Sequence, residues 1–346
     1  MIAAAICALI VANSGAATWY QATTLPLVHP VNDVLMVLFF LLIGMELKKE
    51  MVAGVLADKK QILLPLVAAI GGMIAPALIF LLINQDAPAH WNGWAITSAT
   101  DIAFAVCVLT LVAKSAPPAM KIFLLAIAIF DDLGAILIIA LFYNHDLALL
   151  PLLASGGIIG LLFLLSRLRI TAISPYLALG IALWFGLHAG GIHTTLAGVI
   201  TGLFIPMKRL DWFMHKLHPW VAFFILPLFA FVTAGVNLSG LTLGGLLAPL
   251  PLSIVMGLFL GKQIGIFGAA WVLIRCGFAQ LPEGTSWRQI YGVSVIAGIG
   301  FTMSLFIGML AFSDTLLQEQ VKIGVMAGSL LAALWGWVVL RRKPCA

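Results

Sequence analysis

Apolar positions fill this chain in long runs that are separated by short polar turns. About 20 apolar residues are enough for a helix to cross the hydrocarbon layer of a membrane, and only helices and closed barrels satisfy their backbone there. The runs expected to span are Met1–Tyr20, Val31–Leu47, Leu63–Leu82, Trp94–Ala113, Ile122–Tyr143, Leu147–Ser166, Pro175–Ala189, Thr194–Ile205, Trp220–Val236, Leu246–Ile274, Ile290–Phe312 and Val321–Leu340. The pattern predicts an all-α, polytopic bundle of about 12 transmembrane helices, with residues 1–346 in a single membrane domain.

Two of these runs carry a polar or glycine-rich interruption at their centres. The fourth contains Thr97–Asp101, and the eleventh contains Gly298–Thr302 with glycines at 298 and 300. Backbone that leaves the helical ladder inside a membrane is tolerated only within protein or beside a cavity, and paired broken helices are typical of transporter sites. The alternative for the eleventh run is ordinary close packing through small residues. We predict that helices four and eleven are discontinuous, with Gly298 and Gly300 at the second break.

Composition and the placement of charge support a membrane protein with a defined orientation. Hydrophobic residues make up 63% of the chain and charged residues 9%, with a mean hydropathy of +1.15, which excludes a water-soluble core. The net charge of +5 does not indicate a nucleic-acid partner, because the basic residues gather in alternate loops. By the positive-inside rule those loops, and both termini, are expected to be cytoplasmic.

The fifth apolar run holds two adjacent carboxylates, Asp131 and Asp132, at its middle. Each costs at least ~2.5–3.5 kcal/mol at that depth, so such acids usually face a cavity, a partner or an ion. Neighbours on a helix point about 100° apart, which lets both line one cavity. Protons and a hard cation such as Na⁺ would compete for their oxygens, and Thr100 could add a ligand. The alternative is a buried salt bridge that only fixes helix packing.

Lys262 also lies deep within an apolar run, in Gly257–Gln263. It is too far from the helix ends to reach water comfortably, so it requires an acidic partner. Asp131 and Asp101 are both candidates, and the sequence does not choose between them.

Several motifs together resemble signature segments of the NhaA family of sodium/proton antiporters. They are Phe40–Glu46, Trp94–Ile96, Ala99–Ala105, Phe130–Ile136, Gly191–Gly198, His218–Trp220, Leu281–Gly284 and Gly298–Ser304. They keep their order and spacing and cover nearly the whole chain.

The resemblance implies an electrogenic antiporter of the bacterial cytoplasmic (inner) membrane that exports Na⁺ or Li⁺ in exchange for H⁺, serves pH and sodium homeostasis, and uses no cofactor. It further implies inverted repeats at about residues 63–143 and 246–340, with helices four and eleven broken and crossing. On that template Asp132 is the principal cation ligand and Asp131 is a second ligand or proton carrier. Lys262 pairs with Asp131, Thr100 supports the site, and Asp101 offsets the positive ends of two facing half-helices.

The chain departs from the family pattern in two places. Glu46, Lys49, His215 and His218 match a cytoplasmic pH-sensing cluster, but Lys49 replaces an arginine and Met214 stands where an acid is expected. The connection Thr18–Pro30 is too short for the long β-hairpin through which such proteins dimerise. A homodimer, if formed, is expected to be weak or differently built.

Two other functions use comparable features. An intramembrane aspartyl protease also needs two membrane carboxylates, but on separate helices and in a Gly-x-Gly-Asp context that neither Asp101 nor Asp131 has. A passive cation channel needs ion-binding oxygens but no coupling to protons. The sequence therefore favours a secondary active transporter over an enzyme or a channel.

Overall fold

The computed structural model describes residues 1–54, 59–112, 117–144, 147–236 and 243–341, and all regular structure within these ranges is helical. Helices satisfy every backbone donor and acceptor internally, which a chain of this hydropathy needs in lipid. The chain divides into two compact units. One comprises residues 1–57 and 136–237, and the other comprises residues 58–135 and 238–346.

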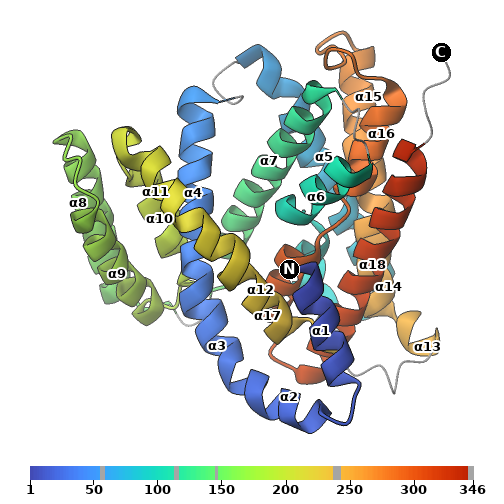
Figure 1. Cartoon of the computed structure of the whole chain (residues 1–346), viewed down its shortest axis with the longest axis horizontal. Helices are drawn as coiled ribbons and strands as arrows, with labels where there is room; N and C mark the ends of the chain where they lie inside the picture. The colour runs from blue at the N-terminus through green and yellow to red at the C-terminus, as the bar shows by residue number, and fades with distance from the viewer. Residues whose placement is uncertain (55–58, 113–116, 145–146, 237–242, 342–346) are drawn as a thin grey trace. The chain divides into compact units, whose positions relative to one another are not determined.

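The first unit is built mainly from the N-terminal helices and the central part of the chain (Figure 1). Its elements are α1 (Ile2–Ala12), α2 (Ala17–Thr24), η1 (Leu25–Leu27), α3 (Val28–Pro30), η2 (Val31–Leu35), α4 (Met36–Ala53), α8 (Leu149–Arg167), α9 (Ser174–Ala189), α10 (Thr195–Phe204), α11 (Met207–Trp220), η5 (Val221–Ile225) and α12 (Leu226–Thr233).

The second unit holds most of α7 and the C-terminal third of the chain. Its elements are α5 (Lys59–Ile83), η4 (Pro88–Thr97), α6 (Ile102–Val112), α7 (Pro118–Phe142), α13 (Leu243–Leu246), α14 (Pro249–Met256), η6 (Gly257–Gly261), η7 (Gln263–Phe267), α15 (Gly268–Arg275), α16 (Trp287–Ile296), α17 (Phe301–Ala311) and α18 (Thr315–Arg341).

Seven helical stretches among the described residues are long and apolar enough to cross a membrane, and two bent helix pairs raise the number to nine. The bent pairs are η4 with α6, at 50°, and α16 with α17, at 43°. Both interruptions predicted from the sequence are therefore confirmed as bends. Three further apolar helices, α1, α9 and α10, have only 10–17 residues.

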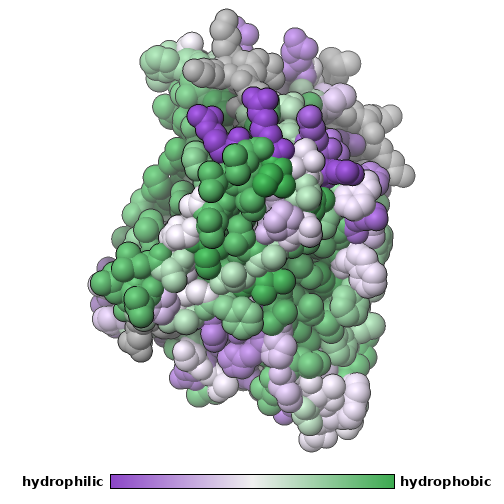
Figure 2. Space-filling model, turned by 90° about the vertical axis from the view of Figure 1, so that its left-hand side faces the viewer, coloured by the Kyte–Doolittle hydropathy of each residue, from purple (hydrophilic) through white to green (hydrophobic). Residues whose placement is uncertain are grey.

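The surface of α8 is apolar and exposed, as expected for a helix that contacts lipid. Only 11% of its most apolar window is buried, and Leu149, Leu150 and Leu153 are each more than 60% exposed. Figure 2 faces the side where α8 and α9 lie, and its surface is largely apolar, with hydrophilic side chains gathered mainly toward one end. Such a face is suited to lipid hydrocarbon.

The N-terminal region differs from the prediction. The first apolar helix, α1, ends at Ala12, whereas the expected connection Thr18–Pro30 is helical and belongs to one continuous stretch, Ala17–Ala53. Proline is tolerated where a helix begins or changes its hydrogen-bond pattern, because no donor is lost there. Pro26 lies in the 3₁₀ turn η1, and the π-helical turn η2 follows Pro30, so the chain adjusts its winding at both prolines without leaving the helix.

Glycines allow α4 and α10 to pack backbone against backbone in the first unit. A Cβ on Gly44 would collide with the carbonyl oxygen of Val199, and one on Gly198 would collide with that of Val37. Close approach through small residues is a common way for membrane helices to associate. The contact joins α4 to α10 between Val37 and Gly44.

Candidate ion-binding site

The second unit brings together all five residues predicted for the ion site. Asp131 and Asp132 lie midway along α7 and are 1% and 3% exposed, while Thr100, Asp101 and Lys262 are no more than 2% exposed. The apolar run that forms α7 makes it a long helix, so its centre lies far from both ends. Charged groups at that depth require nearby donors, ions or partners.

The two helix breaks meet each other. The backbone N–H of Asp101, between η4 and α6, donates to the carbonyl oxygen of Ile299, between α16 and α17, at 2.7 Å. Ser304 Oγ donates to the carbonyl oxygen of Ile96 at 2.7 Å. Interrupted helices leave unsatisfied backbone groups at their ends, and here each break supplies partners for the other.

Gly298 and Gly300 allow close packing around the second break. A Cβ at 298 would collide with the carbonyl oxygen of Leu258, and one at 300 would lie 2.9 Å from Leu258 Cδ2 and 3.1 Å from the carbonyl oxygen of Ala99. Their role is therefore to make room for neighbouring backbone rather than to supply an unusual dihedral angle.

Asp101 accepts hydrogen bonds at the N-termini of two half-helices. Its Oδ1 accepts from the backbone N–H of Phe104 in α6, at 2.9 Å, and its Oδ2 accepts from the backbone N–H and hydroxyl of Thr302 in α17, at 3.1 and 2.5 Å. A carboxylate at a helix N-terminus is stabilised by the partial positive charge there. Thr302 was not anticipated from the sequence, although it lies inside the recognised motif Gly298–Ser304.

Glycines on either side of Lys262 let its helix pack closely against α5. Lys262 is the single residue between two π-helical turns, η6 and η7, of the span Pro249–Arg275. Gly261 and Gly265 on this span lie against the backbone of α5, where a Cβ on Gly261 would come 2.6 Å from Pro76 Cα. Small residues four apart let the helices approach closely, and π-helical turns are frequent at functional sites.

The partner of Lys262 is Asp131, not Asp101. Lys262 Nζ donates to Asp131 Oδ2 at 2.5 Å and to the carbonyl oxygen of Ser98 at 2.6 Å, and the side chains of both ions are fully buried. The structure thus decides between the two partners that the sequence left open.

Thr100 lies between Asp131 and the second break. Its Oγ1 is 2.6 Å from Asp131 Oδ2 and 2.8 Å from the carbonyl oxygen of Ala297. A hydroxyl has one proton to donate, so Thr100 donates to only one of these oxygens at a time. When Asp131 is protonated it can itself donate to Thr100, which then donates to Ala297.

The second oxygen of Asp131, Oδ1, is buried and accepts no hydrogen bond from the described residues. Asp132 follows directly on α7. The described residues contain no cluster of three or more His, Cys, Asp or Glu side chains that could hold a metal, but carboxylate, hydroxyl and carbonyl oxygens are the ligands that hard cations prefer. The donor set fits an alkali cation as cargo.

The first unit holds the residues predicted for pH sensing. Glu46 and Lys49 lie on α4, and His215 and His218 lie exposed on α11. Lys49 Nζ contacts Asp211 Oδ1 at 2.7 Å, which links these two helices. Asp211 was missed by the sequence analysis, yet it precedes Met214 by three residues. Positions three apart share a helix face, so Asp211 supplies an acid one turn before the expected position.

Comparisons with known proteins agree on one family. The family model described as "Na+/H+ antiporter 1" matches residues 1–340. The Na(+)/H(+) antiporter NhaA 2 of Pseudomonas savastanoi pv. phaseolicola is 52% identical, over 99% of this chain and 91% of that protein. The Na(+)/H(+) antiporter NhaA of Bordetella parapertussis is 48% identical, over 100% and 94%.

A solved structure shares the fold at much lower identity. The sodium proton antiporter MjNhaP1 of Methanocaldococcus jannaschii matches with a TM-score of 0.59 and 17% identity, over 97% of this chain and 90% of that one. The resemblance drawn from the motifs is confirmed by the family model and by the relatives' near-complete coverage. This chain belongs to the Na+/H+ antiporter 1 family.

Proposed function

We propose that this chain is a secondary active transporter that exchanges Na⁺ for H⁺ across the membrane by alternating access, with proton and cation competing for Asp131 and Asp132. The observation that carries the proposal is the buried Lys262–Asp131 pair beside the meeting point of two broken helices. Family membership and the antiporter names of the relatives support the exchange of these ions.

The geometry suggests how the competition operates. With Asp131 ionised, Lys262 and Thr100 both donate to its Oδ2. A proton on Asp131 removes its attraction for Lys262 and turns the Thr100 hydroxyl toward Ala297. The same acids then lose affinity for a cation, because a protonated carboxyl offers fewer acceptor sites. Asp132 serves as the principal cation ligand, with Thr100 and Asp131 beside it for Na⁺ or Li⁺.

The proposal extends to the architecture. Counting α1, α9 and α10 as spans together with the nine longer ones gives the twelve helices expected from the sequence. The two bent pairs would be the crossing helices of inverted repeats at about residues 63–143 and 246–340. Both termini would be cytoplasmic in a bacterial inner membrane. Trp271 and Trp337 each stack under an arginine four residues later, near the ends of α15 and α18, an arrangement typical of a membrane interface.

We also propose that exchange is electrogenic and responds to pH through the helix pair α4 and α11, which the Lys49–Asp211 contact joins. Glu46 lies on α4, and His215 and His218 lie on α11. An aspartyl protease and a passive channel find no support in the family match or in the relatives. Any homodimer would have to form without a β-hairpin in residues 18–30, since that segment is helical.

Asp132→Asn tests the site. Dye-monitored ΔpH in proteoliposomes, triggered by Na⁺, Li⁺ or K⁺ between pH 6 and 9, should lose its Na⁺ response, because the amide cannot release a proton or bind the cation as a carboxylate does. Asp86→Asn, at an exposed acid outside the site, is the matched control and should exchange normally. Full exchange by a folded Asp132→Asn protein would remove Asp132 from the mechanism.

A further inference from the structure

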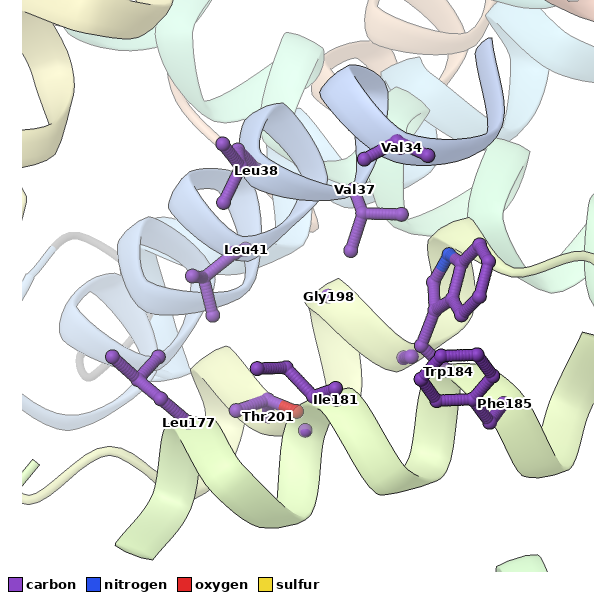
Figure 3. A pocket seen from close by; sticks show the side chains of 12 residues that line it. Val34, Val37, Leu38, Leu41, Leu177, Ile181, Trp184, Phe185, Gly198 and Thr201 are labelled. Carbon is purple, nitrogen blue, oxygen red and sulfur yellow. The ribbon is translucent and has the colours of Figure 1, made fainter. Parts of the chain in front are cut away.

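A cavity that includes none of the candidate ion-site carboxylates lies in the first unit between η2, α4, α9 and α10 (Figure 3). Its volume is about 400 Å³, within the lower range of small-molecule pockets. The lining residues are Val34, Val37, Leu38, Leu41, Leu177, Gly180, Ile181, Trp184, Phe185, Ala197, Gly198 and Thr201. They contribute aliphatic and aromatic side chains from η2, α4, α9 and α10, with no charged group among them.

Two polar side-chain atoms belong to the lining, and neither makes it a water site. Trp184 Nε1 already donates to the carbonyl oxygen of Asp33 at 2.7 Å. Thr201 Oγ1 is buried and makes no hydrogen bond with the described residues. An internal water needs two to four polar partners, and apolar cavities otherwise stay dry. The cavity is therefore unsuited to an aqueous ion pathway.

The rim of the cavity faces the apolar surroundings. Four apolar side chains at the rim are between 37% and 61% exposed: Val34, Leu38, Ile181 and Phe185. In a membrane, the medium at such a rim is hydrocarbon rather than water.

The size of the cavity limits what can enter it. Its wall on η2 and α4 runs from Val34 to Leu41, two helical turns or about 10 Å, whereas a helix with side chains is about 10–12 Å wide. A helix of that length needs more volume than the cavity has, but a flexible hydrocarbon chain does not.

We propose that this cavity binds the acyl chain of a bilayer phospholipid. The chain enters between the exposed side chains of α4 and α9 and lies against Leu38, Ile181 and Phe185 (Figure 3). The lipid headgroup stays outside and takes no part in recognition. The site is separate from ion exchange and does not rest on it.

Trp184 provides the readout. A lysophospholipid with a brominated acyl chain is titrated into the detergent-solubilised protein, and quenching of tryptophan fluorescence is recorded. The difference between each protein and the same protein carrying Trp184→Phe isolates Trp184 from the remaining tryptophans. Quenching of Trp184 should saturate, and an excess of the unbrominated lipid should reverse it.

Variants distinguish a specific cavity from general contact with lipid. Val37→Phe and Leu177→Phe fill the cavity from two different helices, and both should lose the saturable quenching. Val52→Phe, at an exposed site outside the cavity on the same helix, should keep it. Thr201→Val removes the hydroxyl at nearly constant shape and should leave the affinity unchanged, since the occupant is hydrocarbon.

Three outcomes would overturn the proposal. Quenching that rises linearly without saturation would reduce the contact to ordinary lipid solvation. Weaker binding by Thr201→Val would assign a polar ligand instead. A change of oligomeric state in the folded Val37→Phe protein would assign the cavity to a second copy of this chain.

Discussion

At the scale of individual residues, both side chains that donate hydrogen bonds to Asp131 reach the same carboxylate oxygen. Lys262 and Thr100 both reach Oδ2, whereas Oδ1 is buried without a hydrogen bond from the described residues. Two fully buried ions attract strongly but have also lost their hydration, so the pair's net contribution to stability is small compared with the cost of breaking it.

We expect that Lys262→Met will lower the stability of the folded protein by about 3–5 kcal/mol, because it leaves a buried carboxylate without its cation. The double variant Lys262→Met, Asp131→Leu should recover most of that loss. Thermal unfolding in detergent measures the stability of both variants. If the double variant is no more stable than Lys262→Met alone, the pair does not account for the effect.

The sequence predicts these residues better than their contacts. Adjacent acids in an apolar run identified Asp131 and Asp132, but Lys262 is 131 residues from Asp131 along the chain, and either Asp131 or Asp101 could have satisfied it. Which acid Lys262 reaches depends on how the span Pro249–Arg275 packs against α5, and that packing occurs at Gly261 and Gly265. Asp211 was missed for a different reason: an acid was expected at position 214, and Asp211 lies one helical turn earlier on α11.

At the scale of secondary structure, each of the two broken helices depends on hydrogen bonds with the other. Each break leaves backbone groups unpaired, and the partner break supplies donors or acceptors for them, as Asp101 and Ile299 do. Hydroxyl and glycine clusters predicted both breaks. They did not predict the continuous helix Ala17–Ala53, because Pro26 and Pro30 indicate an interruption in sequence while the backbone absorbs both within helical turns.

Gly298→Ala should destabilise the protein by about 1–3 kcal/mol, the usual cost of overpacking, because its Cβ would collide with the carbonyl oxygen of Leu258. Gly268→Ala is the matched control on α15. A Cβ there meets nothing within 4 Å, and alanine in a helix is favoured over glycine by up to ~1 kcal/mol. Equal unfolding temperatures for the two variants would contradict the close approach at residue 298.

On the scale of the whole molecule, the described residues form an all-helical membrane protein whose candidate ion site lies within one of two compact units. Composition alone was enough to predict the membrane class. The number of spans is harder to predict, because α9 and α10 are shorter than the usual crossing length, and an apolar run does not reveal how far its helix extends.

Electrogenic exchange makes a prediction for the complete protein in a sealed membrane. If more protons enter than sodium ions leave, an inside-negative potential should accelerate Na⁺ exit, since a net positive charge moves inward. A potassium gradient with valinomycin sets the potential in proteoliposomes, and ²²Na⁺ efflux gives the rate. The same rate at zero and inside-negative potential would show that the exchange is electroneutral.

Several of the oxygen atoms that accept hydrogen bonds in the candidate site belong to the main chain. The carbonyls of Ser98, Ala297 and Ile299 accept the hydrogen bonds of Lys262, Thr100 and Asp101, and every amino acid carries such a carbonyl. Evolution can therefore exchange the side chains at these three positions and keep the acceptors in place. A survey of sequence conservation would undercount the groups that hold the site together.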